Sequence, residues 1–75
     1  MYYVYLIKDG SKNTSYIGYT NDLKRRLIEH KSKKPELIYY EAYRSEKDAR
    51  NREMRLKQRG QSARRLKERL KYSFV

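Results

Sequence analysis

The feature that most constrains this fold is a pair of short apolar segments near the N-terminus, joined by one cluster of turn-forming residues. Residues 2–7 read YYVYLI, an unbroken run of mostly aromatic and β-branched types that predicts a buried strand. The KDGSKNT cluster that follows contains Gly, Asn, Ser and Asp, which favour a hairpin loop. SYIGY at 15–19 then returns as a second strand, antiparallel to the first because the connection is short.

The next segment predicts a helix and a third strand. Thr20 is the expected N-cap of the helix, Asp22 supports its first turn, and the helical pattern reaches about Lys31. The KSKKPE stretch is expected to be a loop whose exit is marked by Pro35. LIYYEAY at 37–43 alternates only weakly between apolar and polar residues, and it is the expected third strand.

Two more helices complete the expected fold. Ser45 with Asp48 resembles a capping box that opens the first of them, and Gly60 is expected to stop it. The last helix is expected from about Gln61 to Tyr72. The order β-β-α-β-α-α therefore predicts an α+β fold, in which a small three-stranded antiparallel sheet is flanked by three helices.

Length and composition limit the classes of protein. The chain has 75 residues and is expected to form a single domain over residues 1–75, because there is no room for a second core. Zero Cys excludes disulfides, thiolate zinc sites and cysteine nucleophiles, and a single His argues against a histidine-built metal cluster. No apolar run reaches about 20 residues and the N-terminus lacks the features of a signal peptide, so we expect a cytoplasmic protein without a membrane span.

The net charge indicates the kind of partner. Twenty Lys and Arg against nine Asp and Glu leave a formal charge of +11, which predicts a polyanionic partner, most commonly nucleic acid. The excess is concentrated in residues 44–75, where 12 basic residues stand against four acidic ones. Two other interpretations stay open. One is a ribosome-associated or merely soluble basic domain, and the other is an amphipathic membrane-surface helix, which fits less well because the basic helices lack large aromatic residues.

Helical geometry directs one arginine of the first helix toward the sheet. Each residue turns by about 100 degrees, so Arg26 and His30 fall within about 60 degrees of Leu23. Leu23 and Leu27 set the apolar direction of this helix. Arg25 falls on the roughly opposite side, and we therefore expect it to face solvent.

The second helix directs an acid inward in the same way. Ala49 and Leu56 define its buried stripe, and Glu53 falls between them. Arg26 and Glu53 are both expected to face inward, although burying a lone charge is costly. One interpretation is a buried Arg–Glu pair, or two long side chains that reach back to water. The other is a half-buried site in which a carboxylate holds a metal and a guanidinium holds a phosphate.

The two hairpin strands add candidates for this site. On the first strand Tyr3, Tyr5 and Ile7 share one face, and on the second Tyr16 and Gly18 do. Gly in a strand permits the close approach of a backbone, a side chain or a substrate. Tyrosines are usually core or interface residues, so the pattern alone assigns them no catalytic role.

Several motifs resemble the GIY-YIG nuclease family. Residues 3–5, YVY, are similar to its first motif, with Tyr3 in the place of the glycine, and residues 16–18, YIG, are similar to its second. The most specific stretch is YIGYTNDLKRRLIEH, which has an Arg ten residues after its first Tyr and a His fourteen residues after it. LIYYEAYRSEKDARNREMRLKQ is similar to the second half of small stand-alone members, and it contains an E-x-x-x-K helix. The resemblance extends from Met1 to about Leu70.

The resemblance implies a metal-dependent DNA endonuclease, related to phage homing endonucleases and to the N-terminal domain of a bacterial excinuclease, which makes DNA repair an expected setting. Carried over by position, Glu53 is the metal ligand, for Mg²⁺ or Mn²⁺, and Arg26 is the phosphate clamp. Tyr5 and Tyr16 are candidates for activating or positioning the attacking water, with Tyr16 slightly favoured, and His30 is auxiliary. Such a tyrosine needs a pKa below its ordinary value near 10, which Arg26 and the high positive charge are expected to provide.

The alternative function is a basic nucleic-acid-binding module on the same fold whose catalysis is weak or lost. It is favoured because these 75 residues contain no separate DNA-recognition domain. Nucleic acid is the expected partner in either case, with DNA favoured over RNA. RNA as the substrate, a protein partner that supplies specificity, and the oligomeric state all stay open. The side chains expected to contact nucleic acid are the basic ones of the second and third helices: Arg50, Arg55, Lys57, Arg59, Arg64, Arg65 and Lys67.

Overall fold

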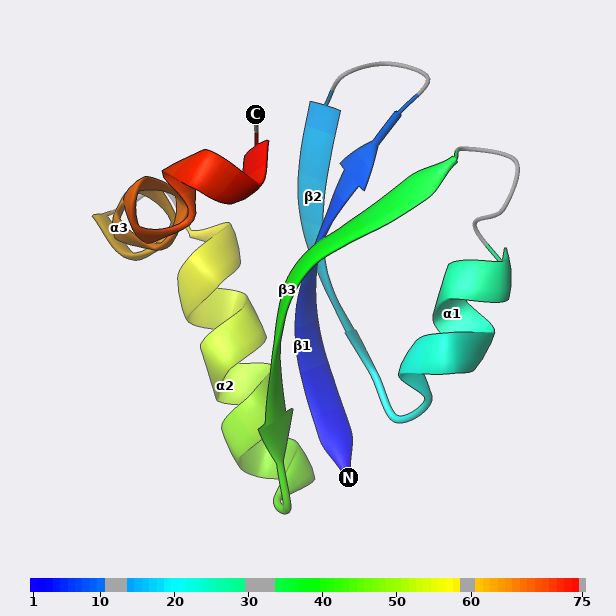
Figure 1. Ribbon diagram of the computed structural model, residues 1–75. Coiled ribbons are helices and arrows are strands. Elements are labelled where there is room, and N and C mark those ends of the chain that lie inside the picture. The colour runs from blue at the N-terminus through cyan, green and yellow to red at the C-terminus, as the bar shows by residue number, and fades with distance from the viewer. Residues whose placement is uncertain (11–13, 30–33, 59–60, 75) are drawn as a thin grey trace.

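The computed structural model describes residues 1–10, 14–29, 34–58 and 61–74 (Figure 1). The elements along the chain are β1 (Tyr2–Asp9), β2 (Thr14–Thr20), α1 (Leu23–Glu29), β3 (Pro35–Tyr43), α2 (Glu46–Lys57), α3 (Gln61–Arg69) and a short 3₁₀ helix (Lys71–Phe74). This order confirms the expected α+β fold. The last predicted helix is divided, because the Ser73 N–H bonds to the carbonyl of Leu70 only three residues back (2.8 Å).

Strand β1 is the middle strand of the sheet, which has the order β2-β1-β3 and is antiparallel throughout. The hairpin ladder continues to the pair Asp9–Thr14, so both strands extend beyond the segments that propensity predicts. Tyr5 lies opposite Gly18 of β2 and opposite Tyr40 of β3. Because paired residues point to the same face, this register brings side chains from all three strands together on one face.

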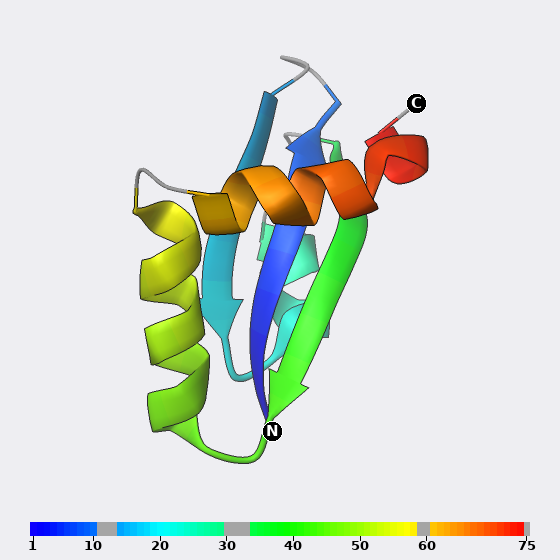
Figure 2. The same cartoon turned by 90° about the vertical axis from the view of Figure 1, so that its left-hand side faces the viewer.

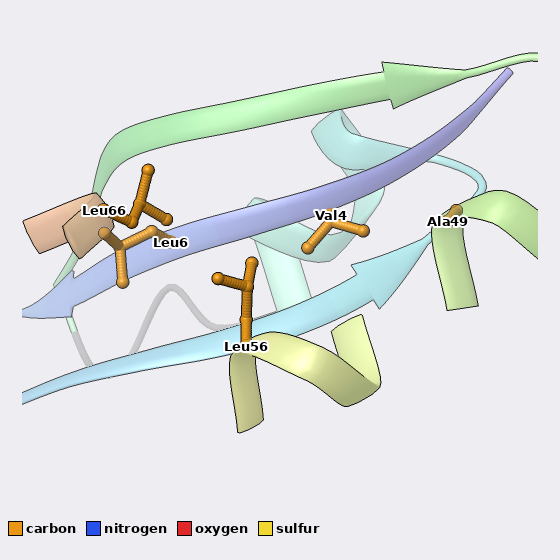
Figure 3. Packing of buried hydrophobic residues seen from close by; sticks show 5 residues of the cluster. All are labelled: Val4, Leu6, Ala49, Leu56 and Leu66. Carbon is orange, nitrogen blue, oxygen red and sulfur yellow. The ribbon is translucent and has the colours of Figure 1, made fainter. Parts of the chain in front are cut away.

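The helices cover both faces of the sheet. Helix α1 lies on one face, whereas α2 and α3 lie on the other (Figure 1, Figure 2). The hydrophobic core is on the α2–α3 side, where Val4 and Leu6 of β1 meet Ala49 and Leu56 of α2 and Leu66 of α3 (Figure 3). All five are buried, which confirms the predicted stripe of α2 and holds both helices against β1.

The start of α1 differs from the prediction. Thr20 is the last residue of β2, and Asp22 is the residue immediately before the helix. The Asp22 carboxylate accepts a hydrogen bond from the backbone N–H of Arg25 (3.1 Å), so Asp22 is the N-cap. The prediction of Thr20 is therefore wrong. Its hydroxyl instead accepts the Asp22 N–H (3.0 Å) in the turn that follows the strand, and the predicted end near Lys31 lies outside the described residues.

Helix α2 begins as predicted. Ser45 is its N-cap, and the Ser45 hydroxyl accepts a hydrogen bond from the N–H of Asp48 (3.4 Å). The helix ends at Lys57, and the Gln58 N–H closes its last turn. The expected stop at Gly60 lies outside the described residues.

Candidate functional site

An arginine and a tyrosine meet on the α1 face of the sheet. Arg26 Nε donates a hydrogen bond to Tyr5 Oη at 3.1 Å. The end of the Tyr5 side chain lies over Gly18 of the neighbouring strand, since a Cβ at this glycine would be 2.3 Å from Tyr5 Oη. Any larger side chain would collide there. Gly18 therefore provides the space in which Tyr5 meets Arg26.

The predicted orientation of α1 is confirmed. Arg25 has 61% of its side chain exposed and pairs with Glu29 (3.4 Å). Arg26 contacts Glu29 through Nη1 (3.3 Å), and 42% of its side chain is exposed. The Arg26 guanidinium is therefore held through Nε and Nη1, and part of the side chain is accessible to an anion in solvent. The hydrogen bond to Tyr5 is the main reason that the pKa of Arg26 is raised above its ordinary value.

Tyr16 lies across the hairpin from Ile7, on the same face as Tyr5. Its hydroxyl oxygen is buried, and burial raises the pKa of Tyr16 above its ordinary value of 10.0. The nearby Tyr5 and Asp9 raise this pKa further, and Arg26 has a smaller opposing effect. The expectation that cations lower the pKa is therefore wrong for Tyr16, because burial outweighs the charge of Arg26.

Glu53 belongs to a row of charged residues on α2 that runs along the edge strand β2. Residues three and four apart share one side of a helix, and Glu46, Arg50, Glu53 and Lys57 have this spacing. Glu46 accepts a hydrogen bond from Tyr19 Oη (2.7 Å), and the Arg50 guanidinium lies 4.6 Å from the centre of the Tyr19 ring. Lys57 lines a pocket together with the first half of β2. Glu53 lies between these contacts and is therefore alongside β2.

The two inward-directed charges do not pair with each other. Glu53 has 20% of its side chain exposed and forms an ion pair with Lys57 (3.1 Å). Arg26 pairs with Glu29, so the ion pairs of the described residues leave Arg26 and Glu53 unconnected. The buried Arg–Glu pair is not formed, because α1 and α2 lie on opposite faces of the sheet (Figure 1) and each charge pairs within its own helix.

A polar pocket of about 340 Å³ lies at the end of the edge strand β2, between α1 and α2. It is lined by side chains from both helices and from the turn after the strand: Tyr19, Thr20, Asn21, Arg25, Arg26, Glu29, Glu46 and Arg50. The pocket brings Arg26 to the same edge of the sheet as the charged row that contains Glu53. Charges of both signs line it, which suits an anion together with a cation.

The basic residues expected to bind nucleic acid are exposed wherever the structure describes them. These residues are Arg50, Arg55, Lys57, Arg64, Arg65 and Lys67. Two of them also form ion pairs within α2, Arg50 with Glu46 (3.8 Å) and Lys57 with Glu53. Arg59 and the expected auxiliary residue His30 lie outside the described residues.

A partly buried charged cluster that the sequence did not predict lies between β3 and α2. Arg52 binds the Glu41 carboxylate through Nε (2.9 Å) and Nη2 (3.1 Å), and the hydroxyls of Tyr39 and Tyr43 donate to the same carboxylate. Burial alone would raise the pKa of Glu41, but these hydrogen bonds and the charge of Arg52 lower it. The cluster therefore attaches α2, the helix that carries Glu53, to β3. An acid between two tyrosines on one strand face was the signal for it.

The fold and the motif residues define the class of protein. A three-stranded antiparallel sheet with three helices is consistent with the GIY-YIG fold. Residues 1–68 match the family model of the GIY-YIG catalytic domain, and the chain belongs to this family. Membership implies nuclease-type activity on nucleic acid in general, and nucleases of this family generally depend on a divalent metal. Neither the curated proteins nor the solved structures contain a significant match to the chain.

The residues at the β2 edge fit a divalent metal that needs few protein ligands. In residues 1–10, 14–29, 34–58 and 61–74, no three His, Cys, Asp or Glu side chains gather into a cluster. Mg²⁺ usually keeps several waters and binds one or two carboxylates together with substrate phosphates. Glu53 provides such a carboxylate beside the edge strand.

None of the helices described is long and apolar enough to cross a membrane.

Proposed function

We propose that the protein is a metal-dependent DNA endonuclease that hydrolyses a phosphodiester at the edge of β2. The observation that carries the proposal is the Arg26–Tyr5 hydrogen bond above Gly18, beside the polar pocket that α1 and α2 both line. Hydrolysis requires that the anionic phosphate oxygens be neutralised, that water be activated and that the leaving group be stabilised. The residues at this edge offer a group for each requirement.

Arg26 acts as the phosphate clamp. Tyr5 holds its Nε and Glu29 contacts its Nη1, so the guanidinium plane is oriented before substrate binds. A charge-assisted hydrogen bond to phosphate is strongest where both groups are partly desolvated, and Arg26 is partly buried. The exposed part of the guanidinium then donates to a non-bridging oxygen.

We assign the role of orienting the attacking water to Tyr5, because its hydroxyl is the one bonded to Arg26. The hydrogen bond donated by Arg26 fixes the position of Tyr5 Oη beside the phosphate clamp. Burial raises the pKa of Tyr16, which makes Tyr16 a poor proton acceptor at neutral pH. Tyr16 then supports the site by packing beside Tyr5, and His30 keeps the auxiliary role that the family resemblance implies.

Glu53 would hold Mg²⁺ or Mn²⁺, with water and phosphate oxygens as the remaining ligands. When bound, the ion supplies stabilisation of charge on the phosphate and on the leaving oxygen. To bind the ion, Glu53 must give up its ion pair with Lys57. Lys57 then joins the exposed basic residues of α2 and α3 that attract the DNA backbone.

Arg25 and Arg26 form a matched pair for the test. Purified protein is incubated with linear and branched DNA in Mg²⁺ or Mn²⁺, with chelator as the baseline. Loss of a transition-state contact costs on the order of 3 kcal/mol, so Arg26→Ala should lose about a hundredfold in rate. Arg25→Ala should lose at most a few-fold, and Glu53→Gln should stop cleavage while DNA binding persists. Equal losses in the two arginine variants would refute the clamp.

A second candidate is a nucleic-acid-binding module without catalysis. The Glu53–Lys57 ion pair favours it, because this contact satisfies the carboxylate without a metal. Under this alternative the wild-type protein binds DNA but shows no metal-dependent cleavage. The comparison with chelator therefore separates the two candidates before any variant is made.

A further inference from the structure

A second pocket lies on the α1 face of the sheet, beside the Arg26–Tyr5 contact. Its volume is about 440 Å³, within the usual range for small-ligand sites. Tyr3 and Tyr40 line it from the sheet, and their rings meet edge to face with 6.0 Å between centroids. Lys24 and Leu27 line it from α1. We refer to this site as the aromatic pocket.

The lining suits a flat ring with polar edges and a negative charge nearby. Tyr40 is 51% exposed, so part of its surface is available for contact. Asn21 adds an amide and Lys24 adds an ammonium group, and the Asp22 carboxylate, which caps α1, also lines the pocket. A nucleobase has a π-face that stacks on tyrosine and edges that bond to amides, and its phosphate attracts an ammonium group.

The aromatic pocket lies next to the proposed cleavage site. Asn21 lines both the aromatic and the polar pockets. Tyr3 lies two residues from Tyr5 on the same face of β1, about 7 Å along the strand, and Tyr40 pairs with Tyr5 across the sheet. When Arg26 holds a phosphate, the adjoining base is therefore close enough to enter the aromatic pocket. The net charge of +11 favours a DNA strand over an uncharged aromatic ligand.

We propose that the aromatic pocket binds one unpaired nucleobase of a DNA strand whose neighbouring phosphate is held by Arg26. The placement of that phosphate rests on the proposed function. A paired base inside a duplex is stacked on both faces and cannot enter a pocket without leaving the stack. The preferred substrate is therefore DNA with an unpaired base next to the cleaved phosphate.

Binding with the metal chelated tests this proposal independently of cleavage. Fluorescence anisotropy compares a fully paired DNA duplex with the same duplex carrying one extra unpaired thymine. The wild-type protein should bind the unpaired base roughly tenfold more tightly, which is the usual effect of one stacked base. A duplex with an abasic residue in place of the thymine has the same backbone distortion and should bind like the paired duplex.

Variants of Tyr40 assign the effect to the aromatic pocket. Tyr40→Ala should remove the preference for the unpaired base, whereas Tyr40→Phe keeps the ring and should retain it. Tyr72 is 82% exposed and does not line the pocket, so Tyr72→Ala is the matched control. This variant should keep the wild-type preference for the unpaired base. A thermal melt of each variant confirms the fold.

The possible outcomes separate this proposal from the proposed function. Equal binding to paired and unpaired DNA by the wild-type protein, or equal loss on both DNAs in Tyr40→Ala, overturns the base site even if the protein cleaves DNA. A tenfold preference that Tyr40→Ala removes supports the base site even if no cleavage is found. A preference that the abasic duplex retains also overturns it, because the backbone alone would then be recognised.

Discussion

Replacing Gly18 with alanine tests the close contact between β1 and β2 on which the Arg26–Tyr5 hydrogen bond depends. The new Cβ would lie 2.3 Å from Tyr5 Oη and 2.4 Å from its Cζ, more than 1 Å inside the ordinary contact distance of about 3.5 Å. The φ of Gly18 is not positive, so steric overlap is the relevant cost. Tyr5 is only 2% exposed, and its ring cannot move without disturbing its neighbours.

The expected loss is about 2–4 kcal/mol in the free energy of unfolding. Overpacking costs about 1–3 kcal/mol, and a shift of Tyr5 Oη by about 1 Å also breaks the bond from Arg26, which adds about 1 kcal/mol. A chain of this size has a stability of roughly 4–11 kcal/mol, and each kcal/mol lost lowers Tm by about 4–8 °C, so the loss should lower Tm by roughly 8–30 °C. Urea and thermal unfolding, followed by circular dichroism, measure it. Gly10→Ala is the control and should lose less than about 1 kcal/mol, because a Cβ at this exposed position meets Lys34 O at 3.1 Å.

A double-mutant cycle decides whether the cost comes from Tyr5. In a Tyr5→Leu background the tyrosine ring is absent, so Gly18→Ala should then cost less than about 1 kcal/mol. The difference between the two costs is the energy of the clash itself. If Gly18→Ala costs the same with and without the Tyr5 ring, the close-contact argument is refuted, and the glycine is needed for another reason.

Three further predictions concern charged groups. The pKa of Glu41 is lowered from 4.5 in the folded state, so its carboxylate stabilises the fold above the unfolded-state pKa and loses this contribution as the pH falls through the lower folded-state value. Glu41→Gln should flatten this acid dependence in urea unfolding at pH 7 and pH 3, and an unchanged dependence would contradict the assignment. Asp22→Ala should cost about 1 kcal/mol through loss of the α1 N-cap, and urea unfolding that shows no loss would contradict this assignment. The logarithm of DNA affinity should fall linearly with the logarithm of salt concentration, with a slope near −0.9 per phosphate contact; salt-insensitive binding would exclude the basic helices as the DNA surface.

The elements could be predicted from local sequence, but their ends could not. Periodicity and turn residues predict β1, yet Lys8 and Asp9 join the strand because they pair with Ser15 and Thr14 of the partner. Similarly, the chain offers two capping residues before α1. Strand β2 extends to Thr20, so Asp22 is the residue immediately before the helix. Residue propensities do not predict where β2 ends, and the choice between Thr20 and Asp22 could therefore not be made from the sequence.

The same division applies to the site. The 100-degree step of a helix distinguishes Arg26 from Arg25, because this geometry is local. The burial of the Tyr16 hydroxyl and the contact of Glu53 with Lys57 depend on how α2 and the strands pack, which no local rule describes. The charged cluster between β3 and α2 joins two different elements, so its pairing became visible only in three dimensions.

The central position of β1 has a consequence for folding. Pairing of β1 with β2 needs only a hairpin, which forms within about 1–10 μs. Pairing with β3 must wait until the longer segment that contains α1 closes on itself. During this interval β1 has one open edge with consecutive apolar and aromatic residues, to which a strand of another molecule can add. Self-association and correct folding therefore compete for the same edge, and dilute refolding favours the native sheet.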